Sequence, residues 1–298
     1  MINKIITASL PIIPKIIIGK VASRYIAGDS LKTAVNTTEQ LNKSGALVTI
    51  DVLGEDVTSE EEAINTTKEC ELVLKAIAEN KLNSNLSLKL TQLGLQIDYK
   101  FCRKNLVSIL KNASRLNNFV RIDMENHTCT DQTLELYFDL NKTYKNFGVV
   151  IQSYLRRSEN DIKLLVKKKA NVRLCKGIYK EPPGIAFQSA DEIRENYKLL
   201  LRLLFENGSY IGIATHDDNL LNYALSYIST KKKKLDQYEF QMLLGVRAEK
   251  RKSIISDGHP LRVYTPYGKD WYAYSIRRLK ENPQMAFYIA KAFFGLEK

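Results

Sequence analysis

The feature that most constrains this chain is a pattern that recurs eight times along it. Each repeat is a short apolar run rich in β-branched residues, followed by a turn and then by a longer stretch with helical spacing. The midpoints of the runs lie about 22 to 40 residues apart, the length of a strand and one returning helix. The runs are ALVTIDVLG (46–54), NLSLKLTQLG (85–94), FVRIDMEN (119–126), FGVVIQSYL (147–155), ANVRLCKGIY (170–179), YIGIATHD (210–217), YEFQMLLG (238–245) and PLRVYTPYG (260–268).

Eight strand–helix units predict an α/β fold, a TIM-like (β/α)8 barrel. The intervening stretches, such as residues 189–208, carry apolar side chains on one face and charges on the other, as covering helices do. A doubly wound open sheet is the competing fold, and it normally has a glycine-rich phosphate turn after its first strand. Neither GxGxxG nor GxxxxGK[ST] occurs in the sequence, which favours the barrel.

The N-terminal 45 residues are predicted to form a helical lead-in, and residues 46–298 the barrel. The first 20 residues are apolar, but Pro11, Pro14 and Lys15 interrupt them. They therefore fall short of the roughly 20 apolar residues that a membrane-spanning helix needs. We expect this segment to pack on the barrel, with attachment to a membrane surface as the alternative, and residues 21–45 to form a helical prelude.

The charge of the chain is unevenly distributed. The 45 Lys and Arg residues outnumber the 33 Asp and Glu residues, for a net charge of +12. Residues 1–150 hold 18 basic and 17 acidic side chains, whereas residues 151–298 hold 27 and 16. An anionic ligand, a membrane surface or nucleic acid could use the excess in the second half, although such an excess is commonly solvated surface.

Cysteine and histidine spacing gives no sign of a metal site or a disulfide framework. The four cysteines lie 32, 27 and 46 residues apart without a CxxC, and the three histidines are equally scattered. So few cysteines in so long a chain are typical of a reducing compartment, and we expect a cytoplasmic protein without a bound metal.

Polar side chains interrupt the carboxyl ends of all eight runs. Because the active site of a (β/α)8 barrel lies at the carboxyl ends of its strands, these polar side chains predict the position of an active site. The residues are Asp51, Glu55, Lys89, Asp123, Glu125, Gln152, Tyr154, Arg173, Lys176, Tyr179, Thr215, His216, Glu239, Gln241 and Tyr264.

Several segments, in order from about residue 25 to 285, resemble the proline dehydrogenase family of flavin-dependent (β/α)8 barrels. The most specific are RLCKGIYKEP (173–182) and YGKDWYAYSIRRL (267–279), neither of which a barrel needs for folding. The others include SLKLTQLG, RIDMEN, QSYLRRS, ATHD and YEFQMLLG. No second large domain is present in the sequence, so the chain is similar to the stand-alone bacterial form, with residues 46–298 as the flavin-binding catalytic barrel.

The resemblance implies a site for the substrate L-proline. Adjacent guanidinium groups of Arg277 and Arg278 project about 100° apart on a helix, and the family uses both, with Lys89 as a third cation, to hold the proline carboxylate. Asp123 is implied to pair with Lys89 beneath the flavin. Lys89, Asp123 and Tyr179 are the implied catalytic residues, and the substrate-binding residues are Lys89, Tyr179, Leu244, Tyr264, Arg277 and Arg278.

The cofactor implied by the resemblance is FAD. Glycine in KGIY permits close approach of the backbone to a ligand, and arginine can meet flavin or phosphate acceptors. The implied cofactor-binding residues are Asp123, Met124, Gln152, Arg173, Lys176, Gly177, Thr215, His216 and Glu281.

The family's reaction is the FAD-dependent oxidation of L-proline to Δ1-pyrroline-5-carboxylate, the first step of proline catabolism. Hydride passes to flavin N5, electrons then pass to a membrane quinone, and a separate pyrroline-5-carboxylate dehydrogenase could take the product. These partners predict a cytoplasmic protein that visits the inner face of the membrane, with no nucleic acid as a partner. A Schiff-base aldolase with Lys89 as nucleophile is one alternative. A basic protein that binds nucleic acid or an anionic membrane is the other, but the sequence lacks aromatic–glycine motifs and a concentrated basic helix.

Overall fold

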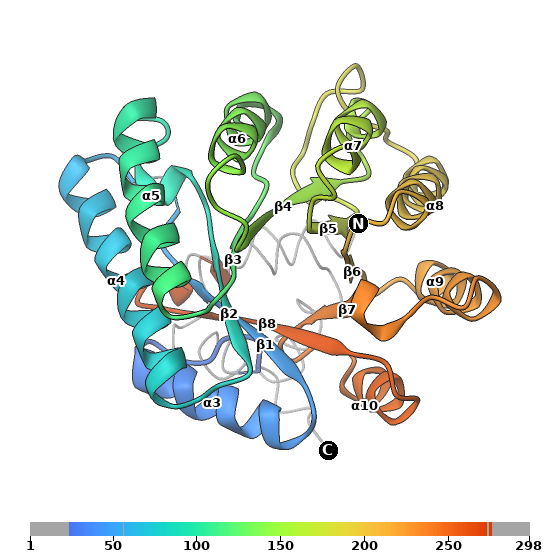
Figure 1. Cartoon of the computed structure of the whole chain (residues 1–298), viewed down its shortest axis with the longest axis horizontal. Coiled ribbons are helices and arrows are strands. Elements are labelled where there is room, and N and C mark those ends of the chain that lie inside the picture. Colours follow the sequence, from blue (N-terminus) through green and yellow to red (C-terminus); the bar gives the residue numbers. More distant parts are fainter. Residues whose placement is uncertain (1–23, 56, 273, 276–298) are drawn as a thin grey trace, which may run out of the picture.

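Eight parallel strands close into a barrel in the computed structural model, which describes residues 24–55, 57–272 and 274–275 (Figure 1). Each strand pairs with the next along the chain, and the last returns to pair with the first. The predicted (β/α)8 barrel is therefore confirmed, and each predicted run overlaps one strand. The strands are β1 (Leu47–Val52), β2 (Ser84–Leu88), β3 (Val120–Ile122), β4 (Phe147–Gln152), β5 (Val172–Cys175), β6 (Ile211–Ala214), β7 (Tyr238–Leu243) and β8 (Leu261–Tyr267).

Helices surround the barrel as an outer ring (Figure 1). They are α4 (Glu60–Glu79), α5 (Tyr99–Arg115), α6 (His127–Leu140), α7 (Ser158–Val166), α8 (Ala190–Glu206), α9 (Asp218–Thr230) and α10 (Ala248–Ser256), with short 3-10 turns at η2 (Thr91–Leu93) and η3 (Leu235–Gln237). The stretch 189–208 forms α8 as predicted: Ser189 caps it by accepting hydrogen bonds from the first-turn amides, and Tyr197, Leu200 and Leu204 lie on its buried face.

The predicted helical prelude contains α3 (Leu31–Lys43), which begins at the N-cap Ser30 and packs against β1 and β8. Ala34 is fully buried in that contact. The first 20 residues of the predicted lead-in lie outside the described residues. The division into a lead-in of residues 1–45 and a barrel of residues 46–298 stays a prediction.

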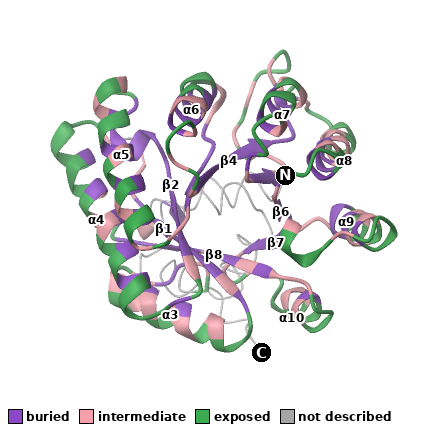
Figure 2. Ribbon diagram, in the orientation of Figure 1, coloured by how far each residue is buried: buried purple, intermediate pink, exposed green. Residues whose placement is uncertain are grey.

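Strand side chains alternate between the helices and the barrel interior, and Figure 2 shows that the strands form the buried centre of the molecule. In β1, Val48 and Ile50 belong to the apolar core, while Thr49 hydrogen-bonds across to Asn85 on β2 at 2.5 Å. The interior also holds the buried guanidinium of Arg121, which donates to the carbonyl of Val149 at 2.9 Å. A large cation fits here because β4 has a glycine opposite: a Cβ at position 148 would lie 2.5 Å from Nη1 of Arg121.

All four cysteines are free thiols. Over the described ranges, no helix combines the length and the apolar character that crossing a membrane requires. Within the same ranges, no group of three or more His, Cys, Asp or Glu side chains is arranged to hold a metal ion.

Candidate active site

A cavity of about 270 Å³ lies at the carboxyl ends of the strands, where the sequence predicts the chemistry. Its volume lies just below the usual range of small-molecule sites. One part of its wall is charged or polar and another is aromatic or aliphatic. The lining residues are Glu55, Lys89, Asp123, Met124, Val150, Gln152, Arg173, Cys175, Lys176, Gly177, Ile178, Tyr179, Ala214, Thr215, His216, Gln241, Met242, Leu243, Tyr264 and Tyr274.

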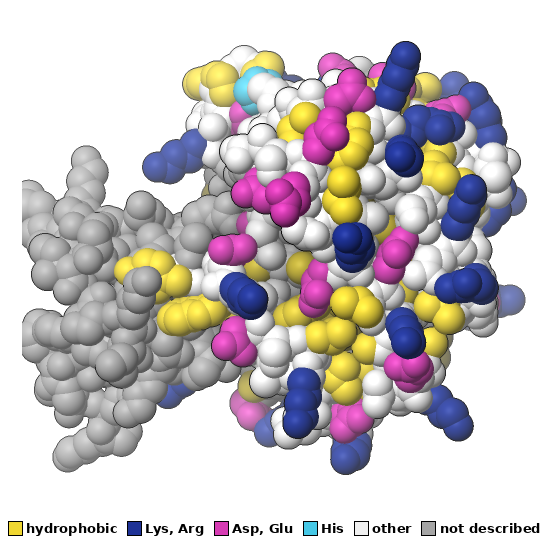
Figure 3. Space-filling view, turned by 90° about the vertical axis from the view of Figure 1, so that its left-hand side faces the viewer, with side chains coloured by type: hydrophobic (Ala, Val, Ile, Leu, Met, Phe, Trp, Pro, Cys, Tyr) yellow, Lys and Arg dark blue, Asp and Glu magenta, His cyan; other side chains and the backbone are white. Residues whose placement is uncertain are grey.

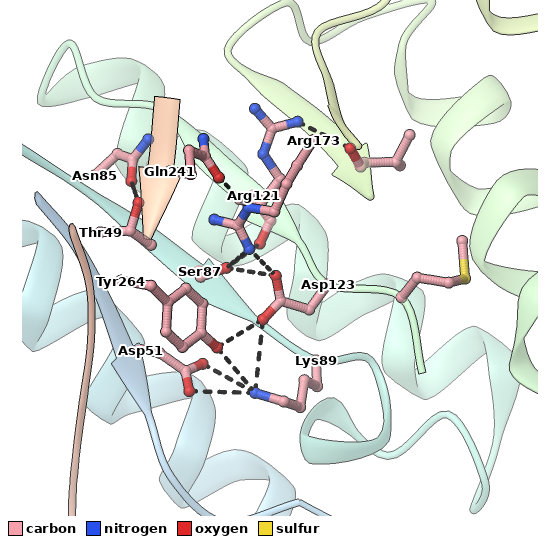
Figure 4. A network of polar contacts seen from close by, with 12 residues as sticks. Thr49, Asp51, Asn85, Ser87, Lys89, Arg121, Asp123, Arg173, Gln241 and Tyr264 are labelled. Carbon is pink, nitrogen blue, oxygen red and sulfur yellow. Dashed lines mark hydrogen bonds and ion pairs between the residues drawn. The ribbon is translucent and has the colours of Figure 1, made fainter. Parts of the chain in front are cut away.

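Lys89 follows the last residue of β2 and is the centre of a polar network drawn in Figure 4. Its Nζ lies 3.1 Å and 3.2 Å from the two carboxylate oxygens of Asp51 on β1. Glu55 and Asp123 follow at 3.5 Å and 3.7 Å, and the ammonium also donates to the hydroxyl of Tyr264 at 3.4 Å. Lys89 is 8% exposed, so three carboxylates of three different segments surround one nearly buried cation.

Asp123 joins this network to the opposite side of the barrel. One carboxylate oxygen accepts hydrogen bonds from Arg173 of β5 at 2.5 Å and from Ser87 of β2 at 2.7 Å. The other oxygen accepts one from the hydroxyl of Tyr264 at 2.8 Å (Figure 4). Arg173 is oriented in turn by Gln241, which accepts from its Nε at 2.5 Å. The predicted pair of Lys89 and Asp123 is thus present, but Asp51 lies nearer to Lys89 and Arg173 nearer to Asp123.

The charges of the network follow from burial and mutual attraction. Burial alone would lower the pKa of Lys89, but the carboxylates of Asp51, Glu55 and Asp123 outweigh it and hold this pKa well above its usual value. Burial would raise the pKa of Asp123, but Arg173 and Lys89 hold it below its usual value. Asp51 differs, because its complete burial raises its pKa to about 6 despite the attraction of Lys89. Lys89 is therefore an ammonium group and Asp123 a carboxylate at neutral pH.

Two tyrosines form aromatic walls, as predicted from the KGIY and RVYTPYG segments. Tyr264, on β8, lies with its ring centroid 5.2 Å from the guanidinium carbon of Arg173. Tyr179 lies in the loop after β5 and packs against Tyr154 and Leu155. Burial raises the pKa of both phenols, so each is a neutral hydrogen-bond donor over the physiological range.

The predicted cofactor-binding residues within the described ranges lie together on this cavity. They are Asp123, Met124, Gln152, Arg173, Lys176, Gly177, Thr215 and His216. Gly177 has a left-handed backbone with φ of +105°, and a Cβ there would lie 2.2 Å from the ring of Tyr154. Only glycine therefore allows the chain to pass over that ring.

His216 is held in its neutral form. Its Nε2 accepts a hydrogen bond from the backbone amide of Leu243 at 3.0 Å, which places the ring proton on Nδ1. Burial, and then the neighbouring charges of Arg247, Lys176 and Arg251, lower its pKa to about 4. The imidazole thus presents a neutral N–H group beside the cavity.

Leu243, not Leu244, lines the cavity on β7. Leu244 follows the last residue of β7 and packs against the apolar core. The implied place of Leu244 in the substrate wall stays a prediction, and its neighbour Leu243 is the leucine that lines the cavity. Arg277, Arg278 and Glu281, which the resemblance assigns to substrate and cofactor, lie outside the described residues.

Among the residues at or beside the cavity, Asp51, Glu55, Leu243 and Tyr274 had no role in the substrate or cofactor site assigned from the sequence. Asp51 and Glu55 contact Lys89, and Leu243 and Tyr274 line the cavity. Asp51 and Glu55 stand at the polar carboxyl end of the first predicted run, but the sequence alone does not show which residue they contact. In the helix that the sequence predicts for YAYSIRR, a spacing of three residues would put Tyr274 and Arg277 on one face, and this was the signal that could have pointed to Tyr274.

Comparison with proteins of known sequence gives the family. Residues 34–289 match the family model described as Proline dehydrogenase. Proline dehydrogenase 1 of Bacillus subtilis (strain 168) is 40% identical over 270 residues, which cover 91% of this chain and 89% of that protein. Proline dehydrogenase 2 of the same organism is 40% identical over 277 residues, covering 93% and 90%.

A solved structure supports the same assignment. The crystal structure of proline utilization A from Bdellovibrio bacteriovorus, inactivated by N-propargylglycine, has a TM-score of 0.83 and 28% sequence identity. The match covers 88% of this chain but only 32% of that longer one, so the similarity concerns the barrel. By sequence and by fold, this chain belongs to the proline dehydrogenase family.

Proposed function

We propose that this protein oxidises L-proline to Δ1-pyrroline-5-carboxylate with FAD as its cofactor. The observation that carries the proposal is the buried ammonium of Lys89 beside the aromatic wall of Tyr264, in a cavity at the mouth of a proline dehydrogenase barrel. A fixed cation suits a carboxylate, and flat apolar surfaces suit a pyrrolidine ring. The named relatives support the same substrate.

The residues of the cavity fit a flavin nucleotide. Oε1 of Gln152 is buried and accepts no hydrogen bond from any described residue, so it is free to accept one from a ligand N–H group. Arg173, Lys176 and the hydroxyl of Thr215 supply donors for the carbonyl and phosphate oxygens of such a ligand. Val150, Met242 and Ala214 supply apolar surface for a flat ring system.

The residues of the chain position and polarise the substrate. FAD, when bound, would supply the acceptor for a hydride, which is two electrons and one proton. Lys89, together with the predicted clamp of Arg277 and Arg278, binds the carboxylate of proline, while Tyr179 and Tyr264 contact its ring. The ring carbon next to nitrogen loses a hydride, the nitrogen loses its proton, and a C=N bond forms. Proline must therefore react as the free amine, and cations around its carboxylate disfavour the ammonium form.

Lys89 is poorly suited to the alternative role of Schiff-base nucleophile. Such a lysine attacks a carbonyl group as a neutral amine, and it normally has a lowered pKa. The three carboxylates near Nζ act in the opposite direction and raise the pKa of Lys89. This electrostatic setting favours carboxylate binding over aldolase chemistry.

The basic-protein alternative gains no support from the face of the molecule shown in Figure 3. On the face shown in Figure 3, Lys and Arg side chains are scattered among Asp, Glu and apolar residues, without a continuous basic patch in its described part.

We propose that electrons pass from the enzyme to a membrane quinone at the inner face of the cytoplasmic membrane. A separate pyrroline-5-carboxylate dehydrogenase would consume the product.

An anaerobic titration of the purified protein tests the function. The protein should carry a flavin absorbance, and L-proline should bleach it with release of Δ1-pyrroline-5-carboxylate, which o-aminobenzaldehyde traps. D-proline and pyrrolidine, which lack the correctly placed carboxylate, serve as controls. A protein that binds FAD but is not reduced by L-proline would refute the proposed substrate.

A further inference from the structure

The Glu181 side chain is buried, although its immediate neighbours in the loop are exposed. The loop joins β5 to α8 and spans residues 176–189, and Lys180, Pro182 and Pro183 on either side of Glu181 are exposed. The side chain of Glu181 is nevertheless only 3% exposed. Burial of a carboxylate costs free energy because the group loses its hydrogen bonds to water, so hydrogen-bond donors of the protein must replace them.

Three donors do so. Oε1 of Glu181 accepts a hydrogen bond from the backbone amide of His127 at 2.9 Å and one from the hydroxyl of Tyr154 at 3.4 Å. The other oxygen pairs with Nδ1 of His127. The donors come from the start of α6 and from the segment after β4, so a single side chain joins three of the loops that surround the cavity.

The start of α6 is a favourable place for this carboxylate. His127 is the first residue of the helix, where backbone amides have no partner within the helix and the helix dipole attracts negative charge. The N-cap residue Asn126 accepts instead from the amide of Thr128 at 3.2 Å. Glu181 therefore completes the capping of α6 from a distant part of the chain.

The two ends of the loop are fixed by other contacts. Near its start, the carbonyl of Lys176 accepts from the amide of Tyr154 at 2.9 Å, and near its end the amide of Phe187 donates to the carbonyl of Tyr154 at 2.8 Å. Between these points Arg156 donates to the carbonyls of Pro183 at 2.8 Å and Ile185 at 3.0 Å. Glu181, two residues after Tyr179, is the side chain of this segment that reaches the donors at the start of α6. The position of the Tyr179 ring in the cavity wall thus depends on the middle of the loop.

We infer that Glu181 is a positioning residue that holds the β5–α8 loop against α6 and so keeps Tyr179 in the substrate wall. The expected effect of Glu181 on proline binding rests on the proposed function, whereas its expected effect on the position of the loop does not. Loss of the anchor frees the middle of the loop and misplaces a wall residue without removing a group that contacts the substrate. The cost falls mainly on KM, because the cations that hold the carboxylate stay in place.

Backbone hydrogen–deuterium exchange of the FAD-loaded enzyme tests the anchor without any turnover. Glu181→Ala should speed exchange of the amides in residues 177–187, and His127→Ala, which leaves the backbone donor, should do so less. Glu181→Gln keeps an acceptor for the amide of His127 and should restore most of the protection. Lys180→Ala, on the same loop but exposed, is the matched control and should leave exchange unchanged.

Steady-state kinetics tests the consequence. Glu181→Ala should raise KM for L-proline about tenfold with little change in kcat, and Glu181→Gln should recover most of the loss. Added to Tyr179→Ala, Glu181→Ala should cost less than a further twofold, because residues that act through one another are not additive. Unchanged exchange in Glu181→Ala, or a fully additive loss in the double variant, would overturn the inference. A wild-type enzyme inactive toward proline would refute the proposed function alone, and the exchange experiment would still decide the role of Glu181.

Discussion

The ammonium of Lys89 contacts both carboxylate oxygens of Asp51, at 3.1 Å and 3.2 Å, in a place where Asp51 has no exposed surface. The pair joins the carboxyl ends of β1 and β2, and Lys89 also lines the cavity. Lys89 therefore neutralises a buried carboxylate of the protein, and we propose that it also attracts the substrate carboxylate.

Replacing Lys89 by Met should affect both tasks. The kcat/KM for L-proline should fall at least about a hundredfold because a charge-assisted contact is lost. The unfolding free energy at pH 8 should fall by about 3–5 kcal/mol because Asp51 is left as an unpaired buried charge. Kinetics and urea unfolding measure the two effects, and a variant with wild-type values in both would contradict the assignment of Lys89.

The pH dependence of that loss has a definite sign. The folded-state pKa of Asp51 is raised, to about 6 from 3.8, and removal of Lys89 raises it further. The folded variant then holds a proton that the unfolded chain has released, so its stability falls as pH rises through this window. The loss of unfolding free energy in Lys89→Met relative to wild type should be small near pH 4 and large at pH 8. Asp51→Asn in the Lys89→Met background should remove this pH dependence without restoring activity.

Gly177→Ala should destabilise the protein by about 2–4 kcal/mol and weaken FAD binding. The backbone at φ of +105° disfavours a side chain, and its Cβ would meet the ring of Tyr154 at 2.2 Å. Gly184→Ala is the control on the same loop, because a Cβ there has no atom within 4 Å and its stability should change by less than about 0.5 kcal/mol. Thermal unfolding and the ratio of flavin to protein absorbance measure both variants, and equal results for the two would contradict the close packing at Gly177.

His216 should make the folded protein more stable as the pH rises from about 4 to 6.5. Its folded-state pKa is lowered from 6.5 to about 4, so within this window the unfolded chain binds the extra proton. The contribution is complete above pH 6.5 and lost by about pH 4, and it amounts to about 3 kcal/mol at most. Urea unfolding of wild type and His216→Gln between pH 4 and 7.5 measures it; parallel stability profiles would show that the imidazole takes up its proton as readily in the folded state.

Tyr264 should set a partial preference for L-proline over trans-4-hydroxyproline. Its ring occupies the cavity wall, and an added hydroxyl would be crowded there, a discrimination worth about 10- to 200-fold. Tyr264→Ser should lower efficiency with proline and narrow the ratio between the substrates. Tyr264→Phe, which keeps the ring but loses the 2.8 Å hydrogen bond to Asp123, should lower efficiency and keep the ratio. Equal use of both substrates by the wild type would contradict the role of the ring.

The barrel could be predicted because its information is local. Each strand lies in a short run rich in apolar and β-branched residues and each helix in an amphipathic stretch, as in β1 and α8, so their types and order can be read without knowledge of distant residues. Closure then follows from the number of units. Which of Leu243 and Leu244 lines the cavity could not be read in this way, because two adjacent leucines give no local sign of which one faces inward.

The sequence by itself determined the fold, the family and the edge of the barrel at which polar groups gather. Only the tertiary structure decided which groups are partners, because Lys89 meets Asp51 across 38 positions and Glu181 meets His127 across 54. Several acidic strand ends had the right chemistry to pair with Lys89, and the register and closure of the strands selected Asp51 as its nearest partner. Burial then set the charges, raising the pKa of Asp51 and lowering that of His216, since desolvation depends on what surrounds a side chain and not on its neighbours in the sequence.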